Sequence, residues 1–233
     1  MSGMGDVHTV PCHYTSADDR LDQTIRRYLT PDDVVLDAGA GRGTAFPYDY
    51  DRWVRRVVGV DVEETVFENP NVSETYVADL ARLPFPDAYF DLIFSRCVLE
   101  HLEDPVAVLA ECRRVLRSGG HLIFRVPNLF HPYAIIARLT PFRFHRWLNA
   151  RRDSRVRDIF PTFYKANNRF TLQRLARATQ FVVRDLEFVE VEPKQVFVHP
   201  LAHRARVAYA KVVQRHDRLR GFRSNIIGTF EAV

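Results

Sequence analysis

The sequence predicts an α/β fold built around a mostly parallel sheet. Short apolar runs at residues 34–36, 57–60, 91–95 and 121–126 alternate with segments long enough to form helices. The runs are rich in branched and aromatic residues, which favour buried strands, and this alternation is typical of βαβ units. With 233 residues and 46% hydrophobic content, the chain can bury the core of one large domain, expected to span residues 1–233.

Two helices are predicted in the first half of the chain. Apolar residues recur at helical spacing over residues 18–29, and the segment is broken at Pro31. Residues 105–117 begin with Pro105, a favoured first helical residue, and are followed by the sequence Ser-Gly-Gly. The first helix therefore leads into the buried strand at 34–36, and the second is the best-defined helix in the chain.

The character of the chain changes after residue 128. Residues 129–170 interleave basic and aromatic residues with prolines, which indicates an insertion that caps a site. The regular pattern then resumes with a helix over 171–180, a strand over 182–191, a basic helix over 201–219 and a last strand near 225–230. We divide the domain into a core at 20–128, the insertion, and C-terminal elements at 171–233.

Charge divides the chain in the same way. Residues 131–233 hold 20 Lys and Arg against 8 Asp and Glu, whereas residues 1–130 hold 13 against 21. A basic half suits an anionic substrate, a membrane surface or nucleic acid, and it is equally typical of solvated helices.

The three cysteines and the N-terminus bear on location. Cys12, Cys97 and Cys112 are odd in number and lack metal-site spacing, so we expect free thiols and no metal. The first residues lack the pattern of a signal peptide, and no apolar run is long enough to span a bilayer. A cytoplasmic location is expected.

A glycine-rich loop follows the first predicted strand. In LDAGAGRG, Gly39, Gly41 and Gly43 allow close backbone approach to a ligand. The dinucleotide pattern G-x-G-x-x-G fails, because Thr44 or Phe46 takes the third glycine position. An acid about twenty residues after such a loop is placed to accept both ribose hydroxyls. Asp61, directly after the predicted strand at 57–60, is such an acid, so the loop and Asp61 together favour a nucleoside ligand.

Four segments, in order and at usual spacing, resemble the class I S-adenosylmethionine-dependent methyltransferases, including small-molecule enzymes of the ubiquinone pathway. They are VLDAGAGRG, GVDV, VADLARLPFPDAYFDLIFSRCVLEHLEDP and RVLRSGGHLIFRVPN, and the resemblance covers roughly residues 20–128. It implies a Rossmann-like, mostly parallel seven-stranded sheet with helices on both faces. It also implies S-adenosylmethionine as cofactor and S-adenosylhomocysteine as product.

The resemblance assigns the cofactor contacts by position. The glycine loop would pass the methionine part, Asp61 would hold the ribose, and Asp79 with Leu80 would contact the adenine. Asp37 would order the loop or receive the methionine ammonium, and the backbone near Ser95 would line the sulfonium site. The full cofactor set is Asp37, Gly39, Ala40, Gly41, Gly43, Asp61, Val62, Asp79, Leu80, Ser95 and Arg96.

His101 is the candidate catalytic residue. It follows the predicted strand at 91–95, and a neutral imidazole can take a proton from a hydroxyl acceptor. The alternative is that His101 only packs or shapes the pocket. Glu100 and His101 resemble an acid–histidine pair that holds a metal in some related enzymes, but Cys97 stands where an acid is expected, so no metal is assigned.

The acceptor is expected to be an oxygen on a sugar, a glycolipid or a small biosynthetic intermediate. Alternatives are N- or C-methylation, RNA methylation and a non-catalytic scaffold. Residues 140–152 combine aromatic and basic side chains, which suits peripheral contact with an anionic inner membrane surface or a lipid-linked acceptor. Nucleic acid ranks lower, because no RNA-binding module is visible. The candidate acceptor-binding residues are Asn128, Tyr133, Arg143, Arg146 and Tyr164.

Overall fold

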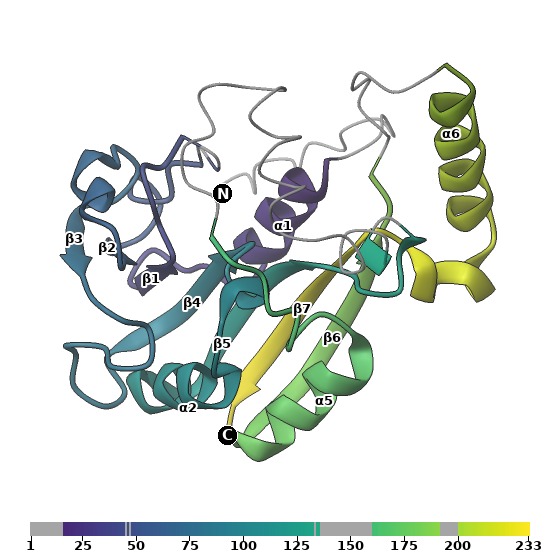
Figure 1. Ribbon diagram of the computed structural model, residues 1–233. Helices are drawn as coiled ribbons and strands as arrows, with labels where there is room; N and C mark the ends of the chain where they lie inside the picture. The colour runs from purple at the N-terminus through teal and green to yellow at the C-terminus, as the bar shows by residue number, and fades with distance from the viewer. Residues whose placement is uncertain (1–15, 45, 47, 133, 136–159, 192–199) are drawn as a thin grey trace, which may run out of the picture.

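A computed structural model describes residues 16–44, 46, 48–132, 134–135, 160–191 and 200–233 (Figure 1). One seven-stranded sheet runs through it in the order β3-β2-β1-β4-β5-β7-β6. The strands are β1 (Val34–Ala38), β2 (Arg56–Asp61), β3 (Glu74–Val77), β4 (Phe90–Arg96), β5 (Leu116–Pro127), β6 (Phe181–Val189) and β7 (Asn225–Ala232).

The sheet is parallel from β3 to β5, whereas β7 pairs antiparallel with both β5 and β6. The predicted fold class is thus confirmed. The helices are α1 (Ala17–Arg26), α2 (Pro105–Val115), α5 (Arg169–Ala178) and α6 (Pro200–Arg215), and short 3-10 turns are η1 (Glu64–Glu68), η2 (Leu99–His101) and η3 (Asp217–Phe222).

Local capping explains where the helices begin. The Ser16 hydroxyl accepts a hydrogen bond from the Asp19 backbone N–H, and the Asp19 carboxylate accepts one from the Ser16 backbone N–H, which forms a capping box for α1. Asp104 caps α2 ahead of Pro105 at the first helical position. Asn168 caps α5. Each cap satisfies backbone donors that a helix leaves free at its start.

Several boundaries differ from the sequence prediction: the helices expected at 18–29 and 201–219 end at Arg26 and Arg215. The helix expected at 105–117 ends at Val115, because Leu116 already pairs with Phe90 and begins β5. Pairing of β5 with β4 therefore ends the helix before Gly119 and Gly120, the residues that were expected to end it. Strand β3 was not predicted, because this short edge strand has two exposed residues and no apolar run.

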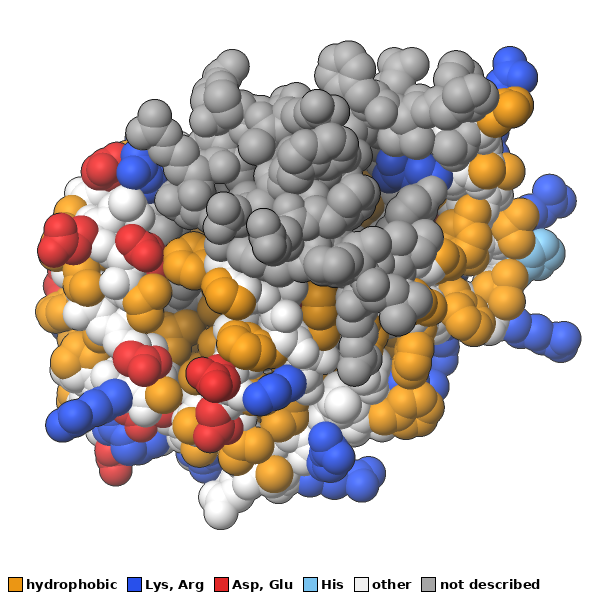
Figure 2. All heavy atoms as spheres, in the orientation of Figure 1, with side chains coloured by type: hydrophobic (Ala, Val, Ile, Leu, Met, Phe, Trp, Pro, Cys, Tyr) orange, Lys and Arg blue, Asp and Glu red, His pale blue; other side chains and the backbone are white. Residues whose placement is uncertain are grey.

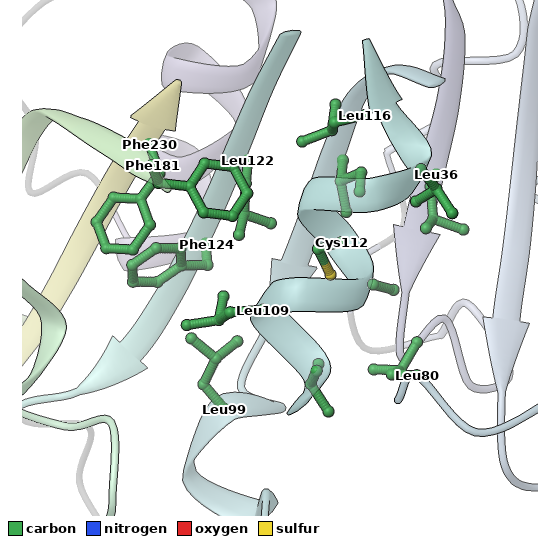
Figure 3. Close-up of a cluster of buried hydrophobic side chains, with 14 of the residues drawn as sticks. Leu36, Leu80, Leu99, Leu109, Cys112, Leu116, Leu122, Phe124, Phe181 and Phe230 are labelled. Atoms are coloured by element: carbon green, nitrogen blue, oxygen red, sulfur yellow. The ribbon is translucent and has the colours of Figure 1, made fainter. Parts of the chain in front are cut away.

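Apolar side chains from both faces of the sheet build the core. Along β5, Leu122 and Phe124 join the cluster beneath α2 and α5, whereas Ile123 joins the cluster beneath α1. This alternation is the two-residue period of a strand. Figure 3 shows Cys112 of α2 among the buried leucines and phenylalanines of the first cluster. Within the described residues, no helix is long and apolar enough to cross a membrane.

Gly228 of β7 makes a close approach that a side chain would block. A Cβ atom built there would lie 2.3 Å from Cζ of Phe124, the residue paired with it on β5. The Phe124 ring is fully buried and packs edge-on against Phe230, with centroids 4.9 Å apart, so it has little room to move. Contact between a buried ring and the strand backbone thus requires glycine.

Gly228→Ala is expected to lower the free energy of unfolding by about 1–3 kcal/mol, the usual cost of overpacking a core. The measurement is urea unfolding followed by circular dichroism. Gly221→Ala is the matched control, because a Cβ at Gly221 would meet nothing within 4 Å. Equal stability of the two variants would contradict the packing at Gly228.

Candidate cofactor site

The glycine loop leaves the carboxyl end of β1 in a conformation that favours glycine. Gly39, Gly41 and Gly43 have φ of 82°, 48° and 72°, values that side chains rarely adopt. A Cβ at Gly39 would lie 2.2 Å from Val98, and one at Gly43 would lie 2.1 Å from Asn69. The spacing of the three glycines therefore follows from the shape of the turn.

Asp61 joins this loop to the end of β2. Its Oδ2 accepts a hydrogen bond from the Gly41 backbone at 2.9 Å, and its Oδ1 accepts one from the Glu63 backbone at 3.1 Å. The backbone N–H groups of Gly39 and Ala40 also bond to the Val60 carbonyl, at 2.8 and 3.1 Å. The carboxylate thus fixes the loop and still faces the cavity beside it.

That cavity has a volume of about 490 Å³ and lies beyond the carboxyl ends of β1, β2 and β4. Ligands of open parallel sheets bind at this position, and the volume suits a nucleoside-sized molecule. The lining residues are Gly39, Gly41, Arg42, Thr44, Asp61, Val62, Glu63, Thr65, Asp79, Leu80, Arg96, Cys97, Val98, His101, Leu102 and Phe160. The structure brings together eight of the predicted residues here: Gly39, Gly41, Asp61, Val62, Asp79, Leu80, Arg96 and His101.

The four other predicted cofactor residues lie in the loop or beside it but do not line the cavity, namely Asp37, Ala40, Gly43 and Ser95. The Ser95 hydroxyl donates to the Ala38 carbonyl at 2.8 Å, and Asn69 and Asn71 donate to the carbonyls of Ala40 and Gly43 at 3.1 and 2.8 Å. Asp37 precedes the loop on β1. Asn69 and Asn71 were missed, because nothing in their local sequence shows that they meet a loop about 28 residues earlier.

The side-chain carboxyl of Asp37 is buried, which raises its pKa. Although the residue as a whole is only partly buried, removal of its carboxyl from water raises the pKa to about 8, and the nearby charge of Asp61 adds to the rise. Arg96 opposes this shift. The group is therefore mostly protonated at pH 7, and a cationic ligand would favour its ionisation.

Arg96 is held in place from α1. Its guanidinium forms an ion pair with Asp18 at 2.7 Å, and Arg125 of β5 contacts the same carboxylate at 2.7 Å. Arg125 also donates to the sulfur of Cys97, which adopts a positive φ of 57°. This arrangement fixes the cavity floor at the end of β4. The sequence did not predict the network, because its members are far apart along the chain.

His101 lines the cavity and contacts the end of the insertion. Its Nδ1 lies 2.8 Å from the Pro161 carbonyl, and its ring lies edge-on to Phe160 at 5.9 Å. A carbonyl oxygen only accepts, so Nδ1 carries a proton, and in the neutral form of the ring Nε2 is the acceptor. Phe160 was missed as a pocket residue, because only tertiary packing brings it to His101.

Two of the predicted acceptor-binding residues, Asn128 and Tyr164, lie in the described part of the chain. Asn128 is fully buried and donates both amide hydrogens, to the carbonyls of Gly221 and Arg223 at 2.8 and 2.7 Å. The Tyr164 backbone donates to the Glu100 carbonyl at 3.2 Å. Neither residue is among the cavity-lining residues.

Tyr133, Arg143 and Arg146 lie outside the described residues, as does the whole basic–aromatic stretch 140–152. In the described part of the chain, no three His, Cys, Asp or Glu side chains gather as a metal site. Cys97 and Cys112 are free thiols.

Known proteins are similar to this chain in sequence and in fold. Residues 36–124 match the family model described as a methyltransferase domain. A probable S-adenosylmethionine-dependent methyltransferase of Mycobacterium tuberculosis is 41% identical over 126 residues, covering 50% of this chain and 43% of that protein. A sarcosine/dimethylglycine N-methyltransferase of Halorhodospira halochloris is 33% identical over 114 residues, covering 45% of this chain and 41% of that protein. The matches span less than half the length of either curated relative.

A solved structure shares the fold. Geranyl diphosphate C-methyltransferase from Streptomyces coelicolor, in complex with Mg²⁺, geranyl diphosphate and S-adenosylhomocysteine, superposes with a TM-score of 0.60 at 15% identity, covering 92% of this chain and 77% of that one. The family match over residues 36–124, the relatives and the shared fold together support a class I S-adenosylmethionine-dependent methyltransferase domain, and the predicted resemblance and cofactor class are confirmed.

The raised pKa of Asp37 predicts how ligand affinity depends on pH. If Asp37 meets the ligand ammonium, binding lowers its pKa and releases a proton, so affinity rises with pH below about 8. One released proton gives at most about a tenfold rise in affinity per pH unit. Calorimetric titration with S-adenosylhomocysteine at pH 6, 6.8 and 7.5 measures this slope.

Asp37→Asn is the control for that slope, because the amide keeps the size of the side chain and cannot ionise. We expect the variant to bind more weakly at pH 7.5 and to lose the rise. The same slope in both proteins would assign the pH dependence to another group.

Proposed function

We propose that the protein transfers a methyl group from S-adenosylmethionine to an oxygen of a sugar, a glycolipid or a small biosynthetic intermediate. The cofactor would supply an electrophilic methyl on its sulfonium. Asp61 would hold the ribose, Asp79 with Leu80 the adenine, and the Gly39–Gly43 backbone the methionine part. The open space over Gly41, whose Cβ position has only Asp61 Oδ2 nearby at 3.9 Å, fits a ligand lying against the loop.

One observation carries the choice of oxygen, namely the hydrogen bond between His101 Nδ1 and the Pro161 carbonyl. It leaves Nε2 as a proton acceptor on a ring that lines the cavity. A hydroxyl must lose its proton as it attacks, so a fixed neutral histidine suits an oxygen acceptor. Two of the proteins named above are an N-methyltransferase and a C-methyltransferase, so N- and C-methylation are the alternatives.

A scaffold without catalysis is less well supported. A scaffold that has lost its cofactor would need neither the open cavity nor three glycines at positive φ beside Asp61. RNA methylation gains no added support, because Phe160 and His101 supply the only aromatic rings of the lining among the described residues. The free thiols Cys97 and Cys112 favour a reducing compartment, and we propose the cytoplasm as the place of reaction.

The acceptor class is tested by methyl transfer from radiolabelled S-adenosylmethionine. Separate reactions would contain free sugars, polyprenyl-phosphate-linked sugars, glycolipids, small amines and RNA. Methyl ethers or esters in the product support the proposal. Label on nitrogen or carbon, or in RNA, contradicts the assignment to oxygen, and cofactor binding without transfer to any class supports the scaffold.

His101 variants test the base directly. His101→Asn retains a donor where Nδ1 meets Pro161 but lacks the basic Nε2. We expect kcat to fall by roughly 10²- to 10⁴-fold, the usual contribution of a general base, with cofactor affinity nearly unchanged. The measurements are steady-state turnover and calorimetry with S-adenosylhomocysteine.

His101→Gln is the comparison, because its amide reaches the place of Nε2 rather than that of Nδ1. If His101 only anchors the Pro161 segment, the Asn variant should keep its activity and the Gln variant should lose it. That order of activities would contradict the base.

A further inference from the structure

Three phenylalanines in the segments that follow β5 and lead into the first turn of α5 are exposed. Phe163 and Phe170 are 42% and 62% exposed, and Phe130 is 37% exposed with its ring centroid 6.3 Å from that of Phe170. Lys165 and Arg169 lie between them in the sequence. We call these five residues the aromatic rim. Soluble proteins rarely leave several large apolar side chains exposed together without a partner for them.

The rim cations lie over the rim rings. Lys165 Nζ is 5.5 Å from the Phe163 centroid, and Arg169 Cζ is 5.3 Å from that of Phe170. Both distances are within the range of cation–π contact. The positive charge is thus held beside the apolar surface, so a partner must accept rings and cations at the same place.

The rim segment itself carries no acid, although Lys165 Nζ donates to the backbone carbonyl of the exposed Glu103 at 2.7 Å. Residues 160–184 hold five Lys and Arg and no Asp or Glu. In the view of Figure 2, acidic side chains gather on the left, over the half formed by β1 to β4, and basic ones prevail on the right. The rim therefore suits a negatively charged partner, and its charge disfavours pairing with the same face of a second copy.

The rim is also connected to the candidate site. The backbones of Phe163 and Tyr164 donate to the Glu100 carbonyl at 2.8 and 3.2 Å, next to His101. Phe160, three residues before Phe163, lines the cavity. A partner bound at the Phe163 end of the rim would therefore lie close to the cavity.

We propose that the aromatic rim docks on an anionic membrane surface. Phenylalanine rings can enter the boundary between headgroups and acyl chains, while Lys165 and Arg169 meet anionic headgroups. With three rings and two cations, the contact is expected to be reversible and salt-sensitive. The docking does not depend on methyl transfer, and it would present the cavity to lipid-borne molecules.

Flotation of the full chain with lipid vesicles tests the proposal. One vesicle contains phosphatidylglycerol and phosphatidylcholine, and the other contains phosphatidylcholine alone. We expect binding to the anionic vesicles, weakened by salt. The double variants Phe163→Ser with Phe170→Ser, and Lys165→Glu with Arg169→Glu, should each reduce the partition coefficient on the order of tenfold or more.

Matched controls come from the acidic half. Phe67→Ser removes a ring that is 62% exposed, as Phe170 is, and Arg55→Glu reverses an exposed cation. Both should bind vesicles like the parent protein. Thermal melting and binding of S-adenosylhomocysteine check that every variant is folded, and retained ligand binding separates this test from that of the methyltransferase.

Three results would overturn the proposal. The first is a lack of vesicle binding by the parent protein, and the second is equal binding to both vesicles. The third is equal loss of binding in the rim and control variants. If the parent protein instead forms a dimer that the rim variants abolish, the rim is an interface between copies.

Discussion

The hydrogen bond from the Gly41 backbone to the Asp61 carboxylate organises the site. It links the loop after β1 to the end of β2, two neighbouring strands whose register brings Ala38 opposite Val60. Because the second carboxylate oxygen binds the Glu63 backbone, Asp61 is fixed at both oxygens and needs little reordering when a ligand arrives. A preorganised polar group loses less entropy on binding than a mobile one. The same residue therefore serves the shape of the loop and the recognition of a ligand.

The sheet explains why this corner is available. Strand order changes direction between β1 and β4, so the loops that leave these strands separate and open the cavity between them. On the other side of the cavity, Asp18 holds Arg96 and Arg125 together, and the Pro161 carbonyl sets the tautomer of His101. Helix α1 and the end of the insertion thus fix side chains that the strand ends alone would leave mobile.

The sequence predicted the parts whose signals are local. Apolar runs gave the buried strands, and the glycine spacing with Asp61 gave the loop and its ligand class. Contacts between distant segments were not predicted, such as those of Asn69 and Asn71 with the loop or of Phe160 with His101. Neither the edge strand β3 nor the early end of α2 could be read locally, because sheet pairing determines both.

The most direct measurement is calorimetric titration of S-adenosylhomocysteine into the parent protein and Asp61→Ala. Loss of the carboxylate removes hydrogen bonds worth about 1.5–3 kcal/mol, so affinity should fall on the order of 10- to 100-fold. Thermal melting would establish that the variant is folded. Binding to the parent protein with that loss supports the role of this carboxylate in the cofactor site. Equal affinity of the two proteins would contradict the central role of this carboxylate.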